Sequence, residues 1–276
     1  MYFYIIDPQK INPKTFERVQ AQLYSSLSEY RINGEIGRVT SVRSIPQLVE
    51  SAFQRGVKTL VAVGSDSTLQ ELINAAKGRD VTIAYIPFTD SELANILGVS
   101  SIDTACRAIA NRLTEQLDLG QVNGQWFFTR LQFGSVPEGR GLFASLTKSG
   151  PAPIEIKFSA DGKYSGTSRI MAGMITNARD NRGGDKNLAN PTDALLDLML
   201  VPAMSGMGSF RFKKDLDGGY FENIPGCSSV HLKRLEIMEP AGLELKCGEK
   251  ILATVPAVIE VIPKSIKMIV GRERTF

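Results

Sequence analysis

The sequence has few of the residues on which several common catalytic and metal-binding chemistries depend. Its 276 residues include one histidine, three cysteines and one tryptophan. The cysteines Cys106, Cys227 and Cys247 lie far apart without a CxxC pair, and the histidine is His231. Structural zinc of the usual Cys/His kind and Ser-His-Asp or Cys-His catalysis would all need that one imidazole, so we expect none of them. Apolar and polar residues alternate around His231, which predicts a surface strand.

Long apolar runs and a strong net charge are also missing. No run approaches the roughly 18 apolar residues of a membrane-spanning helix, and Asp7 and Lys10 interrupt the apolar N-terminus too early for a signal peptide, so we expect a cytoplasmic protein. The net charge of +3 is too small to indicate a nucleic-acid partner. Residues 261–276 carry a net +3 by themselves. This basic end fits either contact with an anionic membrane surface or a solvated strand edge protected by charge.

The first 115 or so residues alternate between strand-like and helix-like patterns. Repeated strand-helix units of this kind predict a doubly wound parallel sheet with helices on both faces, which we assign to residues 1–118. The predicted strands are Tyr2–Ile6, Glu35–Val42, Lys58–Val63 and Val81–Ile86. The predicted helices are Phe16–Tyr30, Pro46–Arg55, Thr68–Ala76, Ser91–Leu97 and Ile102–Leu117.

The pattern changes after Leu117. Asn123-Gly124 between two apolar segments predicts a β-hairpin with a type I′ turn. Short strand-like runs separated by Gly, Pro, Asn and Asp then continue to the C-terminus, so we assign residues 119–276 to an antiparallel β-sandwich domain, with the last strand a candidate to pack back on the first domain. These runs are Ile154–Phe158, Arg169–Thr176, Leu195–Val201, Val230–Ile237, Leu243–Lys246 and Val258–Ile262.

Two loops follow strands of the predicted parallel sheet, where ligands of such sheets bind. The first, residues 64–68, is made of small residues that let backbone N–H groups and a helix N-terminus face an anion. Its Asp66 could hold a magnesium ion or accept a hydroxyl proton. The same residues also fit an ordinary capped helix, with Glu71 completing a capping box from Thr68. The second loop, residues 86–94, likewise fits either a site or a capped helix.

Together these loops resemble a known family. Residues 64–74, GSDSTLQELIN, are similar to the GGDGTLNEVVN signature of the diacylglycerol kinase catalytic family, which is shared with the sphingosine kinases and more distantly with the NAD kinases. Residues 86–99 are similar to its IPLGTGNDFARSLGI motif at the right spacing. The hairpin at residues 117–124, the pair Thr176-Asn177 followed by residues 182–184, and Cys247-Gly-Glu249 resemble later motifs of the family.

The resemblance implies a two-domain kinase fold in which ATP lies between the domains and, with Mg²⁺, phosphorylates a lipid hydroxyl. The residues implied as catalytic are Asp66, as the acidic centre of the phosphate loop, and Glu249, as a general base. The residues implied to bind the nucleotide are Thr40, Gly64, Ser65, Ser67, Thr68, Thr89 and Glu92. No metal ligands are assigned.

The sequence also departs from the family's motifs. Ser65 and Ser67 replace glycines, and a serine adds strain of about 1–2 kcal/mol wherever φ must be positive. The second loop lacks one residue and the family's asparagine, and Cys247 replaces the aspartate of the DGE motif.

An alternative reading is therefore a catalytically inactive kinase fold, a pseudokinase, that binds a lipid, a small molecule or a protein between its domains. NAD kinase activity is disfavoured because its paired glycines are absent. A homodimer and peripheral membrane contact stay open.

Overall fold

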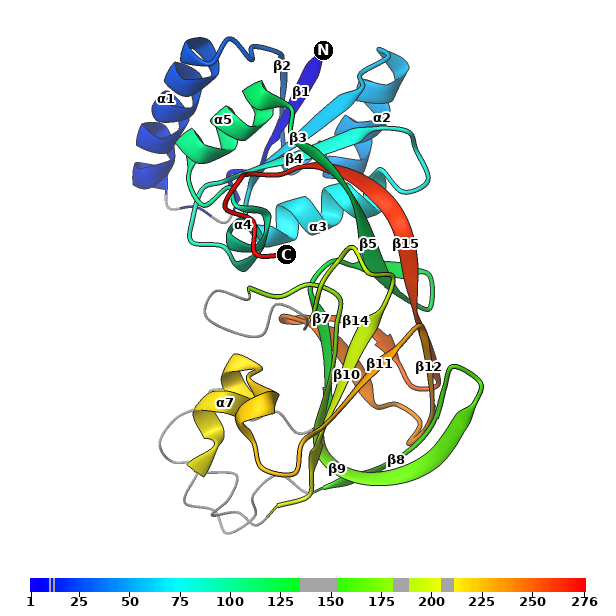
Figure 1. The fold of residues 1–276 in the computed structure, drawn as a ribbon. Helices are drawn as coiled ribbons and strands as arrows, with labels where there is room; N and C mark the ends of the chain where they lie inside the picture. Colours follow the sequence, from blue (N-terminus) through cyan, green and yellow to red (C-terminus); the bar gives the residue numbers. More distant parts are fainter. Residues whose placement is uncertain (10, 12, 135–152, 181–188, 205–210) are drawn as a thin grey trace. The chain divides into compact units, whose positions relative to one another are not determined.

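The computed structural model describes residues 1–276 apart from 10, 12, 135–152, 181–188 and 205–210. The chain forms two compact units (Figure 1). The first contains Met1–Leu119, Arg179–Thr192 and Pro263–Phe276, and the second contains Gly120–Ala178 and Asp193–Ile262. The chain first passes to the second unit after Leu119, and it returns to the first unit twice. Among the described residues, no helix has the length and apolar character needed to span a membrane.

The first unit is built on a parallel sheet, as the sequence predicted. Its strand order is β15-β4-β3-β1-β2, and each neighbouring pair runs parallel. β15 therefore joins this sheet beside β4, at Lys267 and Met268. The strands are β1 (Tyr2–Ile6), β2 (Glu35–Arg38), β3 (Thr59–Gly64), β4 (Thr82–Pro87) and β15 (Ala257–Ile269).

Helices cover both faces of this sheet. They are α1 (Pro13–Glu29), α2 (Ile45–Gln54), α3 (Asp66–Ala75), α4 (Glu92–Leu97) and α5 (Ile102–Asn111). Neighbouring residues of β1 point to opposite faces: Phe3 lies near Leu48 of α2, whereas Tyr4 donates its O–H to the carbonyl of Ile32 and faces Cys106 of α5. In agreement, α2 packs with α3 and α1 packs with α5.

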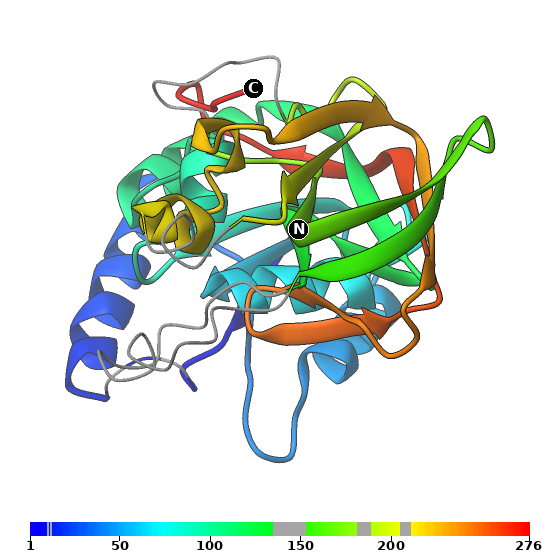
Figure 2. The same ribbon diagram turned by 90° about the horizontal axis from the view of Figure 1, so that it is seen from below.

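The helix predicted over Ile102–Leu117 is too long. α5 ends at Asn111, because Arg112 takes the left-handed conformation with φ 52°, and residues from Thr114 form the strand β5 (Thr114–Val122). The N–H of Val270 donates to the carbonyl of Leu113, so the C-terminal segment runs beside this turn. Strand pairing with residues that are distant in the sequence therefore outweighs the helical preference indicated by the spacing of the apolar residues. Figure 2 shows the C-terminal segment, in red, next to this part of the first unit.

The second unit is antiparallel β structure, as predicted. Its strand order is β14-β13-β7-β9-β8-β12-β15, with β10 joined to β9, β11 joined to β10 and β6 joined to β5. The expected Asn123-Gly124 hairpin is present, and both turn residues have the positive φ that a type I′ turn needs. The elements are β6 (Gln125–Phe127), β7 (Arg130–Gly134), β8 (Ile154–Ala160), β9 (Tyr164–Thr176), β10 (Leu196–Pro202), α7 (Lys213–Gly218), η1 (Phe221–Asn223), β11 (Ser228–Leu232), β12 (Arg234–Glu239), β13 (Glu244–Cys247) and β14 (Lys250–Thr254).

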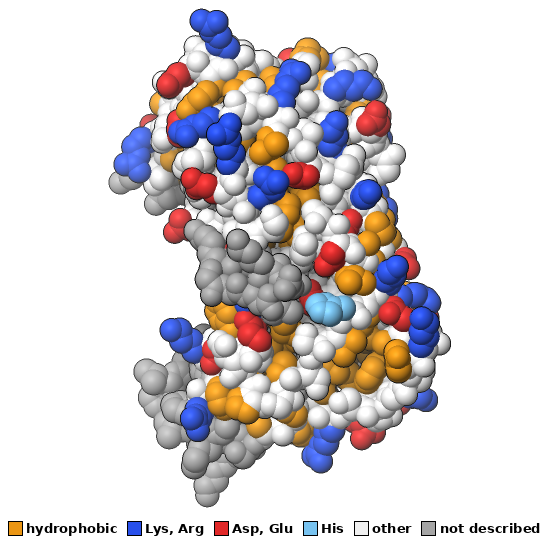
Figure 3. All heavy atoms as spheres, in the orientation of Figure 1, with side chains coloured by type: hydrophobic (Ala, Val, Ile, Leu, Met, Phe, Trp, Pro, Cys, Tyr) orange, Lys and Arg blue, Asp and Glu red, His pale blue; other side chains and the backbone are white. Residues whose placement is uncertain are grey.

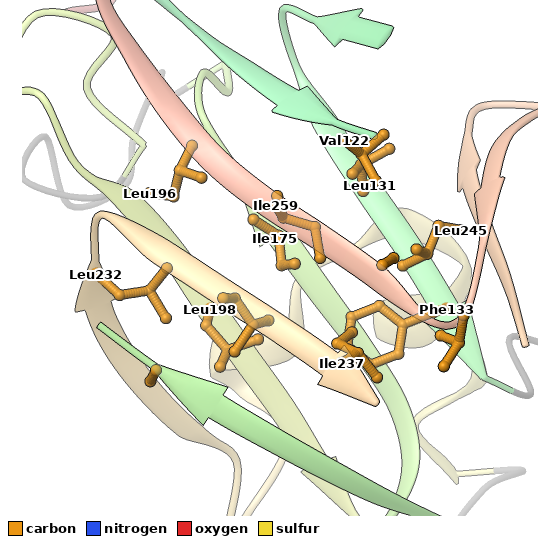
Figure 4. Packing of buried hydrophobic residues seen from close by; sticks show 14 of the residues in the cluster. Val122, Leu131, Phe133, Ile175, Leu196, Leu198, Leu232, Ile237, Leu245 and Ile259 are labelled. Carbon is orange, nitrogen blue, oxygen red and sulfur yellow. The ribbon is translucent and has the colours of Figure 1, made fainter. Parts of the chain in front are cut away.

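The second unit has its own hydrophobic core. Leu131, Ile175 and Leu198, from β7, β9 and β10, are almost completely buried and point toward side chains of β12 and β15 (Figure 4). Ile237 and Ile259 contribute from that side. Along β7, β10, β12 and β15, residues two apart supply this face, which is the period expected when one side of a strand is buried. The alternating runs of the second half of the sequence therefore encode this core.

Several boundaries in the predicted strands are wrong, and β9 begins at Tyr164 rather than at the predicted Arg169. The run Val230–Ile237 is not one strand, because the chain breaks between β11 and β12, where Asp161 Oδ1 accepts hydrogen bonds from the N–H groups of Lys233 and Arg234 at 2.9 and 2.8 Å. β2 ends at Arg38, four residues early. β15 extends to Ile269, beyond the predicted Ile262. His231 does lie on a strand, and its side chain is half exposed.

The basic C-terminal residues are partly neutralised. Arg274 pairs with Glu115 at 2.8 Å within the first unit. On the face drawn in Figure 3, blue basic side chains are interspersed with red acidic ones.

Candidate functional site

The two candidate loops lie side by side in the first unit. β3 and β4 are neighbouring parallel strands, with Gly64 opposite Pro87 in the register, and Phe88 N–H donates to the Gly64 carbonyl at 2.9 Å. Their carboxyl ends therefore meet at one edge of the sheet, and each leads directly into a helix. This edge is the usual ligand-binding position in an open α/β sheet.

The first loop starts its helix earlier than the sequence suggested. Ser65 is the N-cap of α3, and Thr68 is the third helical residue, whose Oγ1 accepts from the Ser65 N–H at 3.2 Å. The expected capping box from Thr68 to Glu71 is therefore wrong. Ser65 has φ −100° and ψ 172°, and Ser67 lies inside the helix. Neither serine needs the positive φ that would strain it, so these two glycine replacements fit the backbone.

Three hydroxyl groups gather at the N-terminus of α3. Ser65 Oγ lies 2.8 Å from Ser67 Oγ and 3.3 Å from Thr68 Oγ1, and Thr68 in turn donates to Asp7 Oδ2 at 3.0 Å. Ser67 is exposed, whereas Thr68 is buried. Hydroxyls can rotate to donate to phosphate oxygens, and a helix N-terminus favours an anion. The arrangement therefore suits a phosphate group bound on the solvent side of Ser67.

Gly64 is required here for space. A Cβ atom at this position would lie 2.7 Å from Thr68 Oγ1, whose side chain is held by Asp7. The glycine lets the end of β3 approach the first turn of α3 closely.

Asp66 lies at the centre of the site, and its carboxylate is engaged by the protein. Oδ1 accepts hydrogen bonds from the O–H groups of Tyr85, at 3.0 Å, and Ser91, and Oδ2 faces the Leu93 N–H at 3.4 Å. The sequence suggested a metal ligand or a proton acceptor at this position. In the structure, the hydrogen bonds of the Asp66 carboxylate join the first loop to β4 and to the second loop.

Tyr85 is a site residue that the sequence analysis missed. It lies in β4, is almost completely buried, and its O–H also reaches the Gly64 carbonyl at 3.3 Å. Burial, and then the charge of Asp66, raise the pKa of Tyr85 well above its ordinary value. One signal could have identified it, because a tyrosine inside a buried apolar strand needs a partner for its O–H.

The second loop is organised by Ser91, which caps α4 by accepting from the Ala94 N–H at 2.8 Å. Of the residues predicted to bind the nucleotide, Thr89 is exposed and Glu92, at the first position of α4, is half-buried. Both lie beside the residues that Asp66 contacts. Asp90 is exposed next to them.

Two other predicted residues lie apart from this cluster. Thr40 follows β2 at the same sheet edge, but β1 separates β2 from β3, and Thr40 is held in a turn by mutual backbone hydrogen bonds with Arg43. Glu249 is exposed in the turn between β13 and β14, in the second unit. The motif residues 182–184 lie outside the described residues.

Mg²⁺ and ATP fit the donor groups of the first unit. Mg²⁺ usually takes one or two carboxylates together with phosphate oxygens and water, so it needs no cage of protein ligands. Within the described part of the chain, no group of three His, Cys, Asp or Glu side chains could hold a metal ion by itself. Asp7 and Asp66 already accept hydrogen bonds from the protein, and the carboxylates of Asp90 and Glu92 lie in the second loop at the same edge.

Comparisons with known proteins agree with this architecture. Residues 3–122 match the family model of the diacylglycerol kinase catalytic domain. A Pseudomonas aeruginosa protein named as a YegS-like lipid kinase is 31% identical over 201 residues, which cover 63% of this chain and 66% of that protein, slightly less than two thirds of its length.

The same architecture occurs in solved structures. A Bacillus anthracis str. Sterne protein assigned to the diacylglycerol kinases superposes with a TM-score of 0.80 at 19% identity, covering 99% of this chain and 97% of its own. An NAD kinase from Archaeoglobus fulgidus, solved in complex with ATP, superposes with a TM-score of 0.58 at 13% identity, covering 100% and 96%. By sequence, residues 3–122 are similar to the diacylglycerol kinase catalytic domain, and the chain shares its fold with these solved kinase structures.

Proposed function

We propose that the protein transfers the γ-phosphoryl group of ATP to a hydroxyl group of a lipid. The observation that carries this proposal is the hydroxyl-lined N-terminus of α3, beside a second strand-to-helix loop, inside the segment that matches the family's catalytic domain. The name of the Pseudomonas aeruginosa relative supports a lipid as the acceptor.

The described residues have distinct roles in this proposal. Ser65 and Ser67 donate hydrogen bonds to phosphate oxygens, and Thr68 holds the turn against Asp7. When bound, Mg²⁺ neutralises charge on the phosphates. In the reaction the lipid oxygen forms a bond to the γ-phosphorus, the bond to the β–γ bridging oxygen breaks, and the hydroxyl proton passes to a base. Glu249 is the base that the family resemblance implies.

A catalytically inactive, ligand-binding protein is the second candidate. One observation favours it: the carboxylate at the centre of the first loop is engaged by Tyr85 and Ser91. Under this reading the framework of the kinase fold is retained, and a lipid or another small molecule binds without being phosphorylated. A homodimer, contact with a membrane surface and a cytoplasmic location stay predictions under both candidates.

The test is phosphorylation by the purified full chain of vesicles that contain diacylglycerol or a long-chain amino alcohol, with labelled ATP and Mg²⁺. We expect a labelled phospholipid, and Glu249→Gln should lower kcat by about 10²- to 10⁴-fold without changing ATP affinity measured by calorimetry. Glu244→Gln is the matched control, because Glu244 is exposed in the same hairpin and pairs with Lys246 at 3.1 Å.

The outcomes separate the two candidates. Labelled product that depends on ATP concentration supports the kinase. Saturable binding of ATP or of vesicles without any labelled product supports the inactive protein and contradicts the kinase. A loss of turnover in Glu244→Gln equal to that in Glu249→Gln would remove Glu249 as the base.

A further inference from the structure

One carboxylate connects three elements around the candidate phosphate loop. Asp66 is the first residue of α3, Tyr85 lies in β4, and Ser91 is the N-cap of α4. The O–H groups of Tyr85 and Ser91 both donate to Asp66 Oδ1, and the Leu93 N–H faces Oδ2. The contact therefore links residues 19 to 27 positions apart in the sequence.

These hydrogen bonds occupy most of the acceptor capacity of the carboxylate. A carboxylate has about four lone-pair positions, and three donors face this one. A general base needs a lone pair directed at the substrate hydroxyl, and a metal ligand must give up a donor or share it. Asp66 could act as a general base or as a metal ligand only by giving up hydrogen bonds that connect the two loops.

The donors to Asp66 are themselves fixed. Tyr85 is 1% exposed and Ser91 is 7% exposed, and Ser91 also accepts from the Ala94 N–H at 2.8 Å. Because burial raises the pKa of Tyr85, this phenol keeps its proton and remains a donor at every physiological pH. The Tyr85 O–H also contacts the Gly64 carbonyl, so it reaches both ends of the turn between β3 and α3.

We propose that Asp66 is a positioning residue rather than a base or a metal ligand, and that Tyr85 and Ser91 are positioning residues with it. The three side chains hold the loop after β3 and the loop after β4 in one fixed arrangement, so that Ser65, Ser67 and Thr89 meet the nucleotide phosphates together. This inference rests on the proposed function for its effect on turnover, whereas the contact between the loops does not depend on it.

The variants remove the contact in three ways, each with a matched control. Tyr85→Phe removes one donor, and Tyr4→Phe is its control, because Tyr4 is equally buried in the same sheet but donates to the Ile32 carbonyl. Ser91→Ala removes another donor together with a helix cap. Ser101→Ala is its control, because Ser101 caps α5 in the same way, at 3.2 Å from the Thr104 N–H. Asp66→Asn removes the charge at nearly constant size.

The first measurement is amide hydrogen exchange, which needs no activity. We expect faster exchange at residues 64–69 and 88–94 in Tyr85→Phe, Ser91→Ala and Asp66→Asn, and no change there in Tyr4→Phe or Ser101→Ala. Ser91→Thr, which keeps a hydroxyl group, should restore the wild-type rates. Unchanged exchange in both loops of Tyr85→Phe and Ser91→Ala would overturn the proposal, even if the wild-type protein proves inactive.

The second measurement is steady-state kinetics with MgATP and a lipid acceptor. A positioning role predicts that Asp66→Asn, Tyr85→Phe and Ser91→Ala each raise KM for MgATP by about tenfold to a hundredfold, with the pH dependence of kcat unchanged in shape. If Asp66 is the base, Asp66→Asn alone will lower kcat by about 10²- to 10⁴-fold and remove the acidic limb of the profile, and the proposal is wrong. A wild-type chain without turnover contradicts the proposed function, while the exchange result still decides the role of Asp66.

Discussion

At the residue scale, the candidate site depends on small and hydroxyl-bearing side chains. Ser65 and Ser67 replace glycines of the resembling motif, yet both adopt ordinary backbone conformations at the start of α3. Their hydroxyls form the polar surface of the turn, and Thr68 connects it to Asp7. Replacing the two glycines by serines therefore adds hydroxyl groups that can donate hydrogen bonds to a phosphate, and it does not strain the backbone.

Gly64→Ala tests the close approach of β3 to α3. The added Cβ would lie 2.7 Å from Thr68 Oγ1, so either the Thr68–Asp7 hydrogen bond or the strand end must shift. We expect the free energy of unfolding to fall by about 1–3 kcal/mol, measured by urea denaturation. Gly166→Ala is the control, since a Cβ there meets nothing within 4 Å. Equal stability of the two variants would show that the turn adjusts at no cost.

At the element scale, helices of the first unit are joined by polar contacts as well as by apolar packing. Tyr30, just after α1, donates its O–H to Asp103 of α5 at 2.6 Å, and Arg107 pairs with the same carboxylate at 2.6 Å. The hydrogen bond from Tyr30, followed by that from Arg107, lowers the pKa of Asp103 below its ordinary value of 3.8. The contact is exposed, so water and salt weaken it.

This contact gives the α1–α5 pair a defined pH dependence. Because the pKa of Asp103 is lower in the folded protein, its stabilising effect is complete above pH 3.8 and is lost as the pH falls through the folded value. We expect the Asp103 carboxyl carbon to titrate below 3.8 in an NMR pH series, and Tyr30→Phe to move that titration upward. Tyr24→Phe, on the exposed side of α1, should leave it unchanged. A titration at the ordinary value in the wild type would show that Tyr30 and Asp103 do not interact in solution.

At the scale of the whole molecule, the chain builds two units with separate cores and passes between them more than once. The helices α1–α5 all belong to the first unit, while the one tryptophan, Trp126, is buried in the second. Tryptophan fluorescence and helical circular dichroism therefore report mainly on different units.

A core substitution in each unit should affect these two signals differently. Ile175→Ala in the second unit and Leu60→Ala in the first each remove a completely buried side chain, which costs about 2–5 kcal/mol. In urea unfolding, we expect Ile175→Ala to shift mainly the fluorescence transition and Leu60→Ala mainly the helical one. Coincident shifts of both signals in both variants would show that the two cores unfold as one cooperative unit.

Much of the fold was predictable because it depends on local periodicity. The apolar runs of β1, β3 and β4 and the amphipathic spacing of α2 and α3 identified the parallel sheet, and Asn123-Gly124 identified the hairpin that follows it. The errors occur where distant residues decide the structure. The helix predicted to Leu117 gives way to β5, and Asp161 ends β11 from 72 residues away.

The sequence by itself determined which residue types form the candidate site and in which loops they lie, because those loops are short and adjoin strongly patterned strands. Only the tertiary structure decided what Asp66 contacts. Its carboxylate could equally have faced solvent, a metal or a substrate, and no local pattern shows that Tyr85 and Ser91 come within hydrogen-bond distance of it. That contact exists because β3 and β4 are neighbours in a parallel sheet, which brings both strand ends to one edge.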